Sequence, residues 1–238
     1  MAISLKGKHV LITGASRGTG RAFARKLAAE GCRVSLIARN LSALEKLRDE
    51  IGENARCFGA DMTQNAEIDK AVEFFEKEFG PVDILINNAG TGWYKSLDES
   101  SYEDAELTLQ LNVNALVRLT KKLASGMISR QSGTILNIAS DLSFRPLPNM
   151  AVYTASKHAL AGFSRSLARE LKDKNVKVMM LNPGLIDTGF GGREEGSIPP
   201  PHALVPDDLA DVVHFMLTRP DYMLIDQMTV VPLGQDEF

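Results

Sequence analysis

Tyr153 and Lys157 are the residues whose types and spacing most clearly indicate chemistry. They lie four residues apart, so on a helix they occupy one face, one turn apart. A phenol with a fixed ammonium neighbour can give a proton to a carbonyl or take one from an alcohol. The spacing alone is weak evidence, since Tyr and Lys meet this way on many helix surfaces. Ser140 upstream and a glycine-rich turn near the N-terminus strengthen the prediction of an acid–base centre.

The glycine-rich turn follows a first predicted strand at 9–12 and opens a predicted helix at 18–30. In such a turn one glycine permits the tight bend, one lets backbone amides approach phosphate, and one lets helix and strand pack closely. The helix N-terminus then presents free N–H groups and a positive dipole end to a pyrophosphate. A turn that binds nothing is the alternative. The predicted dinucleotide contacts here are Gly14, Ser16, Arg17, Gly18, Thr19 and Gly20.

The end of the second predicted strand indicates which dinucleotide to expect. An acidic residue usually binds the ribose hydroxyls at this point, whereas here the chain reads Ile37-Ala38-Arg39-Asn40. A guanidinium can hold a 2′-phosphate through paired hydrogen bonds. Arg39 and Arg17 are therefore predicted to converge on that phosphate, which favours NADP(H) over NAD(H). The alternative is that both are solvated surface arginines.

Short apolar runs alternate with longer amphipathic segments along the chain. Because these runs lack a clean polar alternation, they are typical of strands buried on both faces of a parallel sheet. The alternation predicts an α/β fold, a single doubly wound Rossmann domain over 1–238, with a mostly parallel sheet flanked by helices on both faces. Strands are expected at 9–12, 33–38, 55–58, 82–86, 134–138, 176–181 and 227–232, and helices at 18–30, 41–51, 64–79, 101–126, 151–173 and 207–217.

Composition and charge narrow the class of protein. With 238 residues, 44% of them hydrophobic, the chain can bury the core of one α/β domain. A net charge of −3 without a basic block argues against a nucleic-acid partner, and no apolar run is long enough to span a bilayer. The Cys and His spacings fit no metal site, and small buried thiols are expected, although the two cysteines could also pair in space. The N-terminus lacks a signal-peptide pattern, so a cytoplasmic location is expected.

Together these residues resemble the short-chain dehydrogenase/reductase family, in its branch of about 250 residues. The resemblance runs from Lys8 to about Thr188 and weakens beyond. Each motif alone is modest evidence, but the ordered set with matching spacings is specific. The motifs are Thr13-Gly14-x-x-x-Gly18-x-Gly20, Asp61, Asn87-Asn88-Ala89-Gly90, Asn112, Ser140, Tyr153-x-x-x-Lys157 and Pro183-Gly184.

The resemblance implies a catalytic role for each of four residues. Tyr153 is the proton donor or acceptor, and Ser140 holds the substrate oxygen beside it. Lys157 supports Tyr153 and also holds the nicotinamide ribose. Asn112 lies in the middle of a predicted helix, where a short amide competes for backbone bonds; the resemblance implies that it anchors a water linking Lys157 to solvent. Asn114 lies nearby, but the alignment with the family motif favours Asn112.

The resemblance also extends the set of cofactor contacts beyond the glycine-rich turn and Arg39. Asp61 could instead serve as a cap before Thr63, and both roles are compatible. Asn88 has a purely structural alternative, bracing the sheet. The segment after Pro183 has a strand-exit turn as its alternative. The implied additional contacts are Asp61, Met62, Asn88, Ala89, Gly90, Tyr153, Lys157, Pro183, Gly184, Ile186 and Thr188.

The proton chemistry sets an energetic requirement on Tyr153. A free phenol has a pKa near 10, about three units above neutrality. Roughly 4 kcal/mol of preferential phenolate stabilisation would bring this pKa close to neutrality. Lys157 and the positive charge of an oxidised nicotinamide are the expected sources.

The function predicted is an oxidoreductase that transfers a hydride between NADP(H) and a small-molecule carbonyl or secondary alcohol. The alternative is a non-catalytic NADP(H)-binding redox sensor, against which the intact set of proton-transfer residues argues. Segment 184–206 has glycines, successive prolines and no periodicity, and is predicted to be the substrate loop. Its Arg193, Glu194 and Glu195 could select polar groups or be simply solvated. The apolar walls expected for a medium-sized carbonyl are Trp93, Tyr94, Leu142, Phe144, Leu147 and Phe190.

The resemblance further implies that helices 101–126 and 151–173 pair with those of a second subunit, giving a homodimer or homotetramer. A stripe of small residues would allow the close approach, although it could equally pack on the chain's own sheet. The ending, 228–238, departs from the glycine-rich ending of many family members, which puts the tetramer in doubt. The stripe consists of Ala151, Ala155, Ala159 and Gly162.

Overall fold

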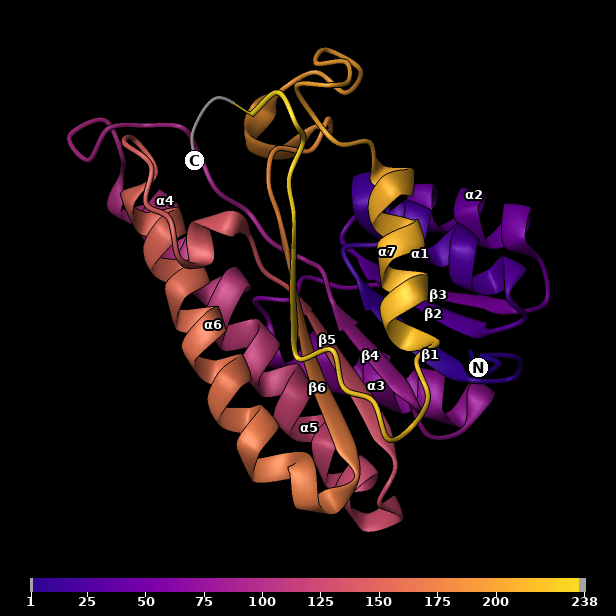
Figure 1. Cartoon of the computed structure of the whole chain (residues 1–238). Helices are drawn as coiled ribbons and strands as arrows, with labels where there is room; N and C mark the ends of the chain where they lie inside the picture. Colours follow the sequence, from indigo (N-terminus) through magenta and orange to yellow (C-terminus); the bar gives the residue numbers. More distant parts are fainter. Residues whose placement is uncertain (1, 236–238) are drawn as a thin grey trace.

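Seven strands form one sheet in the computed structural model, which describes residues 2–235 (Figure 1). The strand order is β3-β2-β1-β4-β5-β6-β7, and every neighbouring pair is parallel. The doubly wound α/β fold is confirmed, with a wholly parallel sheet where a mostly parallel one was predicted. The strands are β1 His9–Thr13, β2 Arg33–Ala38, β3 Ala55–Gly59, β4 Ile84–Asn87, β5 Gly133–Ile138, β6 Val176–Pro183 and β7 Gln227–Val230.

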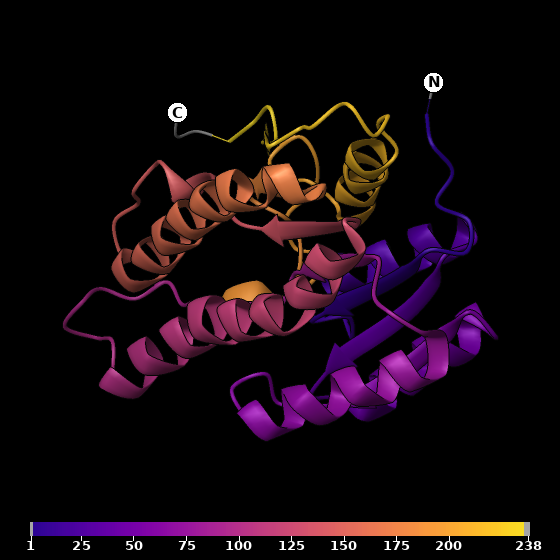
Figure 2. The same ribbon diagram turned by 90° about the horizontal axis from the view of Figure 1, so that it is seen from below.

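Helices cover both faces of the sheet. Apolar side chains of α1, α2 and α7 pack on one face, and those of α3, α5 and α6 on the other. Seen from below, α6, α5 and α3 follow one another along the sheet (Figure 2). The helices are α1 Gly18–Ala29, α2 Leu41–Ile51, α3 Asn65–Phe79, α4 Tyr102–Leu109, α5 Leu116–Arg130, α6 Ala151–Leu171 and α7 Pro206–Leu217.

The long helix expected at 101–126 is interrupted. A π-helix, η1 Gln110–Ala115, separates α4 from α5. The widened turns of a π-helix often mark functional positions, and the buried Asn112 lies inside this one. The amide that looked unfavourable in a regular helix therefore has a place where the regular pattern is broken.

The strand order reverses direction between β1 and β4. Successive strands run outward from β1 to β3, and the chain then returns to place β4 on the other side of β1. The loops that follow β1 and β4 consequently diverge, which opens a crevice at the carboxyl ends of these strands. The glycine-rich turn and Asn88 lie at this crevice, since they follow β1 and β4 directly.

A chain of buried polar side chains connects the two central strands to two helices. Asn87 donates to Asn137 at 2.8 Å and to Thr120 on α5 at 3.0 Å. Asn137 donates to Ser164 on α6 at 2.8 Å. Asn87 and Asn137 are also register partners in β4 and β5. Because a buried amide is costly without partners, this series of hydrogen bonds fixes both the strand register and the position of α6.

His9 is a fully buried imidazole at the start of β1. Its Nδ1 lies 2.8 Å from the carbonyl oxygen of Gly80, and its Nε2 lies 2.8 Å from Ser35 Oγ. A carbonyl can only accept, so Nδ1 carries the proton and Nε2 accepts from the serine hydroxyl. This neutral ring is fully satisfied, and burial lowers the pKa of His9 below its usual 6.5.

Residues 2–235 lack two features that are typical of other protein classes. No helix there is both long and apolar enough to cross a membrane, and no three His, Cys, Asp or Glu side chains gather as metal ligands. Both cysteines are free, with Cys32 buried and Cys57 half-buried, so the alternative in which they pair is wrong.

The buried His9 makes fold stability depend on pH. Below pH 6.5 the unfolded chain binds a proton at His9 that the native protein does not bind, so the free energy of unfolding falls as the pH drops. His9→Asn should reduce stability at pH 7.5 by about 1–3 kcal/mol and should show a smaller fall between pH 7.5 and 5.5. Urea unfolding at both pH values measures this. His158→Asn, at an exposed ring, is the control, and an unchanged fall in the His9 variant would contradict the prediction.

Candidate active site

A cleft of about 960 Å³ lies at the carboxyl ends of the central strands. Except for Gly20, every residue predicted to contact the cofactor lines it, and so do the catalytic candidates Ser140, Tyr153 and Lys157. Gly20 and Asn112 do not line the cleft; both are buried beside it. The sequence motifs, which are spread over most of the chain, therefore converge on one cavity.

Gly20 and Asn88 hold the shape of the glycine-rich turn. A Cβ at Gly20 would collide with the Gly14 carbonyl oxygen and the Asn88 amide, so only glycine lets α1 approach β1 this closely. Asn88 donates to the Thr13 carbonyl at 2.9 Å and accepts from Thr19 Oγ1 at 2.8 Å. These contacts show the bracing role that was weighed for Asn88, and its side chain also faces the cleft.

The residues expected near the adenosine end are Arg17, Arg39 and Asp61. Arg39 is exposed and lines the cleft. The Arg17 guanidinium lies against Gly189, where a Cβ would be 3.1 Å from Arg17 Nη1. Asp61 Oδ1 accepts from both the backbone N–H and the hydroxyl of Thr63, at 2.9 and 2.8 Å. The capping role considered for Asp61 is therefore present, and the residue still lines the cleft.

Ser140 and Tyr153 meet at the inner end of the cleft. Ser140 follows β5 and is buried, and its hydroxyl donates to Asp141 Oδ1 at 3.0 Å. Burial raises the pKa of Tyr153 well above its usual value, while a hydrogen bond with Ser140 acts in the opposite direction. This differs from the expected lowering of the phenol pKa. The physical reason is that desolvation of the phenolate dominates in the protein alone.

Lys157 lies one turn further along α6, with 6% of its surface exposed. Its ammonium donates to the carbonyl oxygen of Ile138 at 3.0 Å and lies 5.5 Å from the centre of the Tyr153 ring. Burial lowers the pKa of Lys157 to about 8. The ammonium is thus held beside the phenol by a backbone carbonyl.

Asn112 is the residue that ties the β4 end to α6. Its Nδ2 donates to the Thr91 carbonyl at 2.8 Å and to Ser156 Oγ at 3.0 Å, and its Oδ1 accepts from the Thr91 N–H at 2.8 Å. Ser156 in turn donates to the Tyr153 carbonyl at 2.7 Å. Asn114, by contrast, is exposed, and its side chain donates to Gln110 on the same helical segment.

Comparison with known proteins now identifies the family. The family model for short chain dehydrogenases matches residues 8–196. The chain belongs to the short-chain dehydrogenase family.

Relatives and solved structures agree with this membership. An uncharacterized oxidoreductase of Staphylococcus epidermidis is 29% identical over 235 residues, which cover 96% of this chain and 99% of that protein. The alcohol dehydrogenase of Thermococcus sibiricus, complexed with 5-hydroxy-NADP, has a TM-score of 0.91 and is 30% identical, covering 97% of this chain and 99% of that one. The 3-ketoacyl-(acyl-carrier-protein) reductase of Brucella melitensis, complexed with NADH, has a TM-score of 0.89 and is 33% identical over the same shares. Because these neighbours carry different dinucleotides, any preference in this chain must be argued from its own residues.

In this short-chain dehydrogenase, four of the six predicted apolar walls line the cleft: Tyr94, Leu142, Leu147 and Phe190. Trp93 does not; it lines a separate small hollow together with Lys95. Phe144 is also outside the cleft and remains 43% exposed. The Phe190 ring packs against Tyr153, with centroids 5.4 Å apart.

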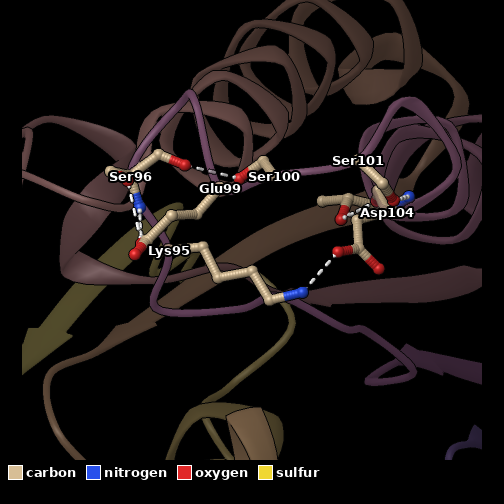
Figure 3. A network of polar contacts seen from close by, with 7 residues as sticks. Lys95, Ser96, Glu99, Ser100, Ser101 and Asp104 are labelled. Atoms are coloured by element: carbon tan, nitrogen blue, oxygen red, sulfur yellow. Dashed lines mark hydrogen bonds and ion pairs between the residues drawn. The ribbon is translucent and has the colours of Figure 1, made fainter.

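The loop between β4 and α4, which carries Tyr94, is held by a network of polar contacts (Figure 3). Lys95 pairs with Asp104 at 2.7 Å, and Ser96 donates to Glu99 at 2.8 Å. Ser101 accepts from the Asp104 N–H at 3.0 Å and caps α4. This wall of the cleft is therefore fixed by local contacts.

Segment 184–206, which was predicted to be the substrate loop, contacts both Tyr94 in the loop after β4 and Arg21 on α1. Arg193 stacks over the Tyr94 ring at 5.0 Å, and Glu195 pairs with Arg21 on α1 at 3.3 Å. Arg193 lines the cleft, whereas Glu194 is exposed. Arg193 and Glu195 thus connect this segment to the loop after β4 and to α1, respectively.

Sequence reasoning missed three residues of the site. Gly92 is buried against Tyr153, since a Cβ there would collide with the phenol ring. Asp141 accepts the bond from Ser140, and its position directly after the serine was an available signal. Gln235 donates to Asp141 Oδ2 at 2.8 Å from the far end of the chain, a contact that no local pattern could indicate.

The burial of Lys157 should lower the stability of the fold. With a native pKa of about 8 against 10.5 unfolded, the unfolded chain binds the extra proton between these values. The free energy of unfolding therefore rises with pH across this window, and the cost, on the order of 3 kcal/mol, is fully present below pH 8. Lys157→Met should raise stability at pH 7 by about 1–3 kcal/mol, measured by urea unfolding.

Lys121→Met, at an exposed lysine of α5, is the matched control and should change stability by less than about 0.5 kcal/mol. A Lys157→Met protein that is less stable than wild type at pH 7 would show that the ammonium stabilises the fold.

Proposed function

We propose that this short-chain dehydrogenase is an NADP(H)-dependent oxidoreductase acting on a carbonyl or secondary alcohol. The observation that carries the proposal is the meeting of Ser140, Tyr153 and the buried Lys157 in the cleft that the glycine-rich turn also lines. A proton donor, an oxygen-holding hydroxyl and a dinucleotide-shaped turn have one shared use, which is hydride transfer to a carbonyl.

Features of the chain itself support the fit of a dinucleotide. Helix α1 begins without a side-chain cap at Arg17, so N–H groups of its first turn can bind phosphate. The Lys157 ammonium has three donors, and the Ile138 carbonyl satisfies one of them, which suits ribose hydroxyls as further acceptors. When bound, the nicotinamide would give or take the hydride.

In this proposal, residues of the chain supply the proton to the substrate carbonyl and orient its oxygen. Because the pKa of Tyr153 is raised by burial, the phenol is neutral at pH 7, the form that donates to a carbonyl oxygen. Ser140 holds the same oxygen from the other side, and Lys157 fixes the phenol and the ribose. This protonation state favours the reduction of a carbonyl by the resting protein.

Asn112 supports this arrangement by position. Its amide connects Thr91 to Ser156, whose hydroxyl bonds to the Tyr153 carbonyl. The water-mediated relay from Lys157 to solvent, which the family resemblance implies, is part of the proposal.

The substrate class follows from the walls of the cleft. Leu142, Leu147 and Phe190 line the same cleft as Tyr153, and Phe190 packs against its ring, which suits a medium-sized carbonyl with an apolar body.

The stripe of Ala151, Ala155, Ala159 and Gly162 on α6 is exposed and is not used by the chain's own sheet. Its close-approach surface supports the proposal of a homodimer or homotetramer.

Removing the phenol oxygen tests the chemistry. Tyr153→Phe should lower kcat by about 10²–10⁴-fold with NADPH binding largely unchanged, because the ring and Lys157 remain. A panel of carbonyl compounds, followed by the loss of NADPH absorbance, gives the turnover, and fluorescence titration gives the affinity. Tyr222→Phe, at a ring that is 92% exposed, is the control. Full turnover by Tyr153→Phe would refute the assignment, and NADPH binding without turnover in wild type would favour the redox sensor.

Arg39 tests the cofactor preference independently of any substrate. Arg39→Ala should weaken NADPH binding by about 10–150-fold, the value of a charge-assisted bond of about 1.5–3 kcal/mol, and should leave NADH binding nearly unchanged. Arg48→Ala, at an exposed residue paired with Asp49, should leave both affinities at the wild-type level. Equal losses for the two dinucleotides in Arg39→Ala would refute the 2′-phosphate role.

A further inference from the structure

Asp141 is a buried carboxylate directly beside the proposed substrate-holding serine, and it is 2% exposed. Its Oδ1 accepts from Ser140 Oγ at 3.0 Å. Its Oδ2 accepts from Arg145 at 2.6 Å and from Gln235 at 2.8 Å. A buried charge is costly unless it is paired and hydrogen-bonded, so these donors determine where the carboxylate lies.

The carbonyl oxygen of the Gln235 amide reaches the segment that follows β6. This oxygen, Oε1, accepts from the Leu185 N–H at 2.9 Å. Leu185 directly follows Pro183-Gly184, which the family resemblance implies are cofactor contacts and which line the cleft. Gly184 is in close contact with this amide, because a Cβ at Gly184 would collide with Gln235 Oε1. One side chain therefore joins the loop after β5 to the loop after β6.

The tail that carries Gln235 is itself fixed in place. The Gly234 N–H donates to the Pro201 carbonyl at 2.9 Å, and His202 Nδ1 lies 3.2 Å from the Gly234 carbonyl. Figure 1 shows the yellow end of the chain rising past β6 towards the orange loop that follows this strand. The tail thus reaches the cleft, which Gly234 and Gln235 line.

We propose that Gln235 is a positioning residue for the hydride-transfer reaction. It aligns the Ser140 hydroxyl, through Asp141, with the predicted cofactor contacts that follow β6, through Leu185. The substrate oxygen is held on one side of this link and the cofactor on the other, so the amide sets their mutual geometry. The inference rests on the proposed function, and Gln235 acts on the reacting groups only through Asp141 and Leu185.

Two hydrogen bonds orient the Ser140 hydroxyl, and one of them depends on Gln235. Ser140 Oγ accepts from the Leu142 N–H at 3.2 Å and donates to Asp141. The first bond depends on the local backbone. The second depends on the Asp141 carboxylate, whose position is fixed by hydrogen bonds from Gln235 and Arg145. Loss of the amide leaves one donor on Oδ2 and releases the Leu185 N–H at the same time.

Gln235→Ala tests the link with two readouts. We expect kcat with an accepted carbonyl to fall by about 10–100-fold, as for a small misplacement of reacting groups, with a smaller change in KM. Hydrogen exchange should become faster in peptides that contain Leu185. Leu233→Ala is the matched control, since Leu233 lies in the same tail and is 95% exposed; it should match wild type in both readouts.

Gln235→Glu separates a positioning role from a merely structural one. At neutral pH the new carboxylate repels Asp141 and cannot donate to it. Two carboxylates that share a site have one raised pKa, so on acidification the protonated Glu can donate as the amide does. Within residues 2–235, the other titratable or charged groups near this region include Arg145, which donates to Asp141, and His202, Tyr153 and Lys157, which line the cleft with Gln235; they are common to both proteins. The ratio of Gln235→Glu activity to wild-type activity should therefore rise as the pH falls from 8 to 5.5.

A ratio that stays flat across this range overturns the proposal, as does an unchanged kcat or unchanged Leu185 exchange in Gln235→Ala. Recovery of Gln235→Glu at low pH also shows that the variant is folded. Failure of the proposed function is recognised separately, by full activity of Tyr153→Phe. In that case the exchange at Leu185 still decides whether Gln235 connects the two loops.

Discussion

The contact between the Lys157 ammonium and the Ile138 carbonyl determines the arrangement of the site. It places a positive group at the end of β5, inside the protein, one helical turn from Tyr153. To hold this position, α6 must lie close to β5, and the bond from Asn137 to Ser164 fixes that approach. The rest of the fold stabilises the protein enough to compensate for a buried charge, which is a common relation between function and stability.

Burial shifts the pKa values of Tyr153 and Lys157 in opposite directions. Burial keeps the Tyr153 phenol neutral and moves the pKa of Lys157 down to about 8. Both shifts have one cause, since each charged form loses water in the same cleft. A phenolate would need additional positive charge in front of it, which the surrounding residues do not supply. In the proposed function, the direction of proton transfer therefore depends on the ligands that enter the cleft as well as on the residues around it.

The sequence was sufficient for the fold class and the order of the strands along the chain, because buried parallel strands have a distinctive apolar pattern. Local motifs also predicted that Ser140, Tyr153 and Lys157 would meet, and the structure places them at one cleft. Patterns of this kind could not predict the π-helix at Gln110–Ala115, which depends on how Asn112 bonds to a distant loop. They could not place Trp93 outside the cleft, nor bring Gln235 to Asp141, since both depend on packing between segments far apart in sequence.

Gly92 has a consequence for redesign of the pocket. Its Cα lies against the Tyr153 ring, so any side chain there would move the phenol itself. Tyr94, two residues later, is 51% exposed and contacts the Arg193 guanidinium across the cleft. Directed evolution of substrate range in this enzyme should therefore randomise position 94 and leave position 92 as glycine. Position 94 has room for other side chains, whereas position 92 has none, although only one residue separates them.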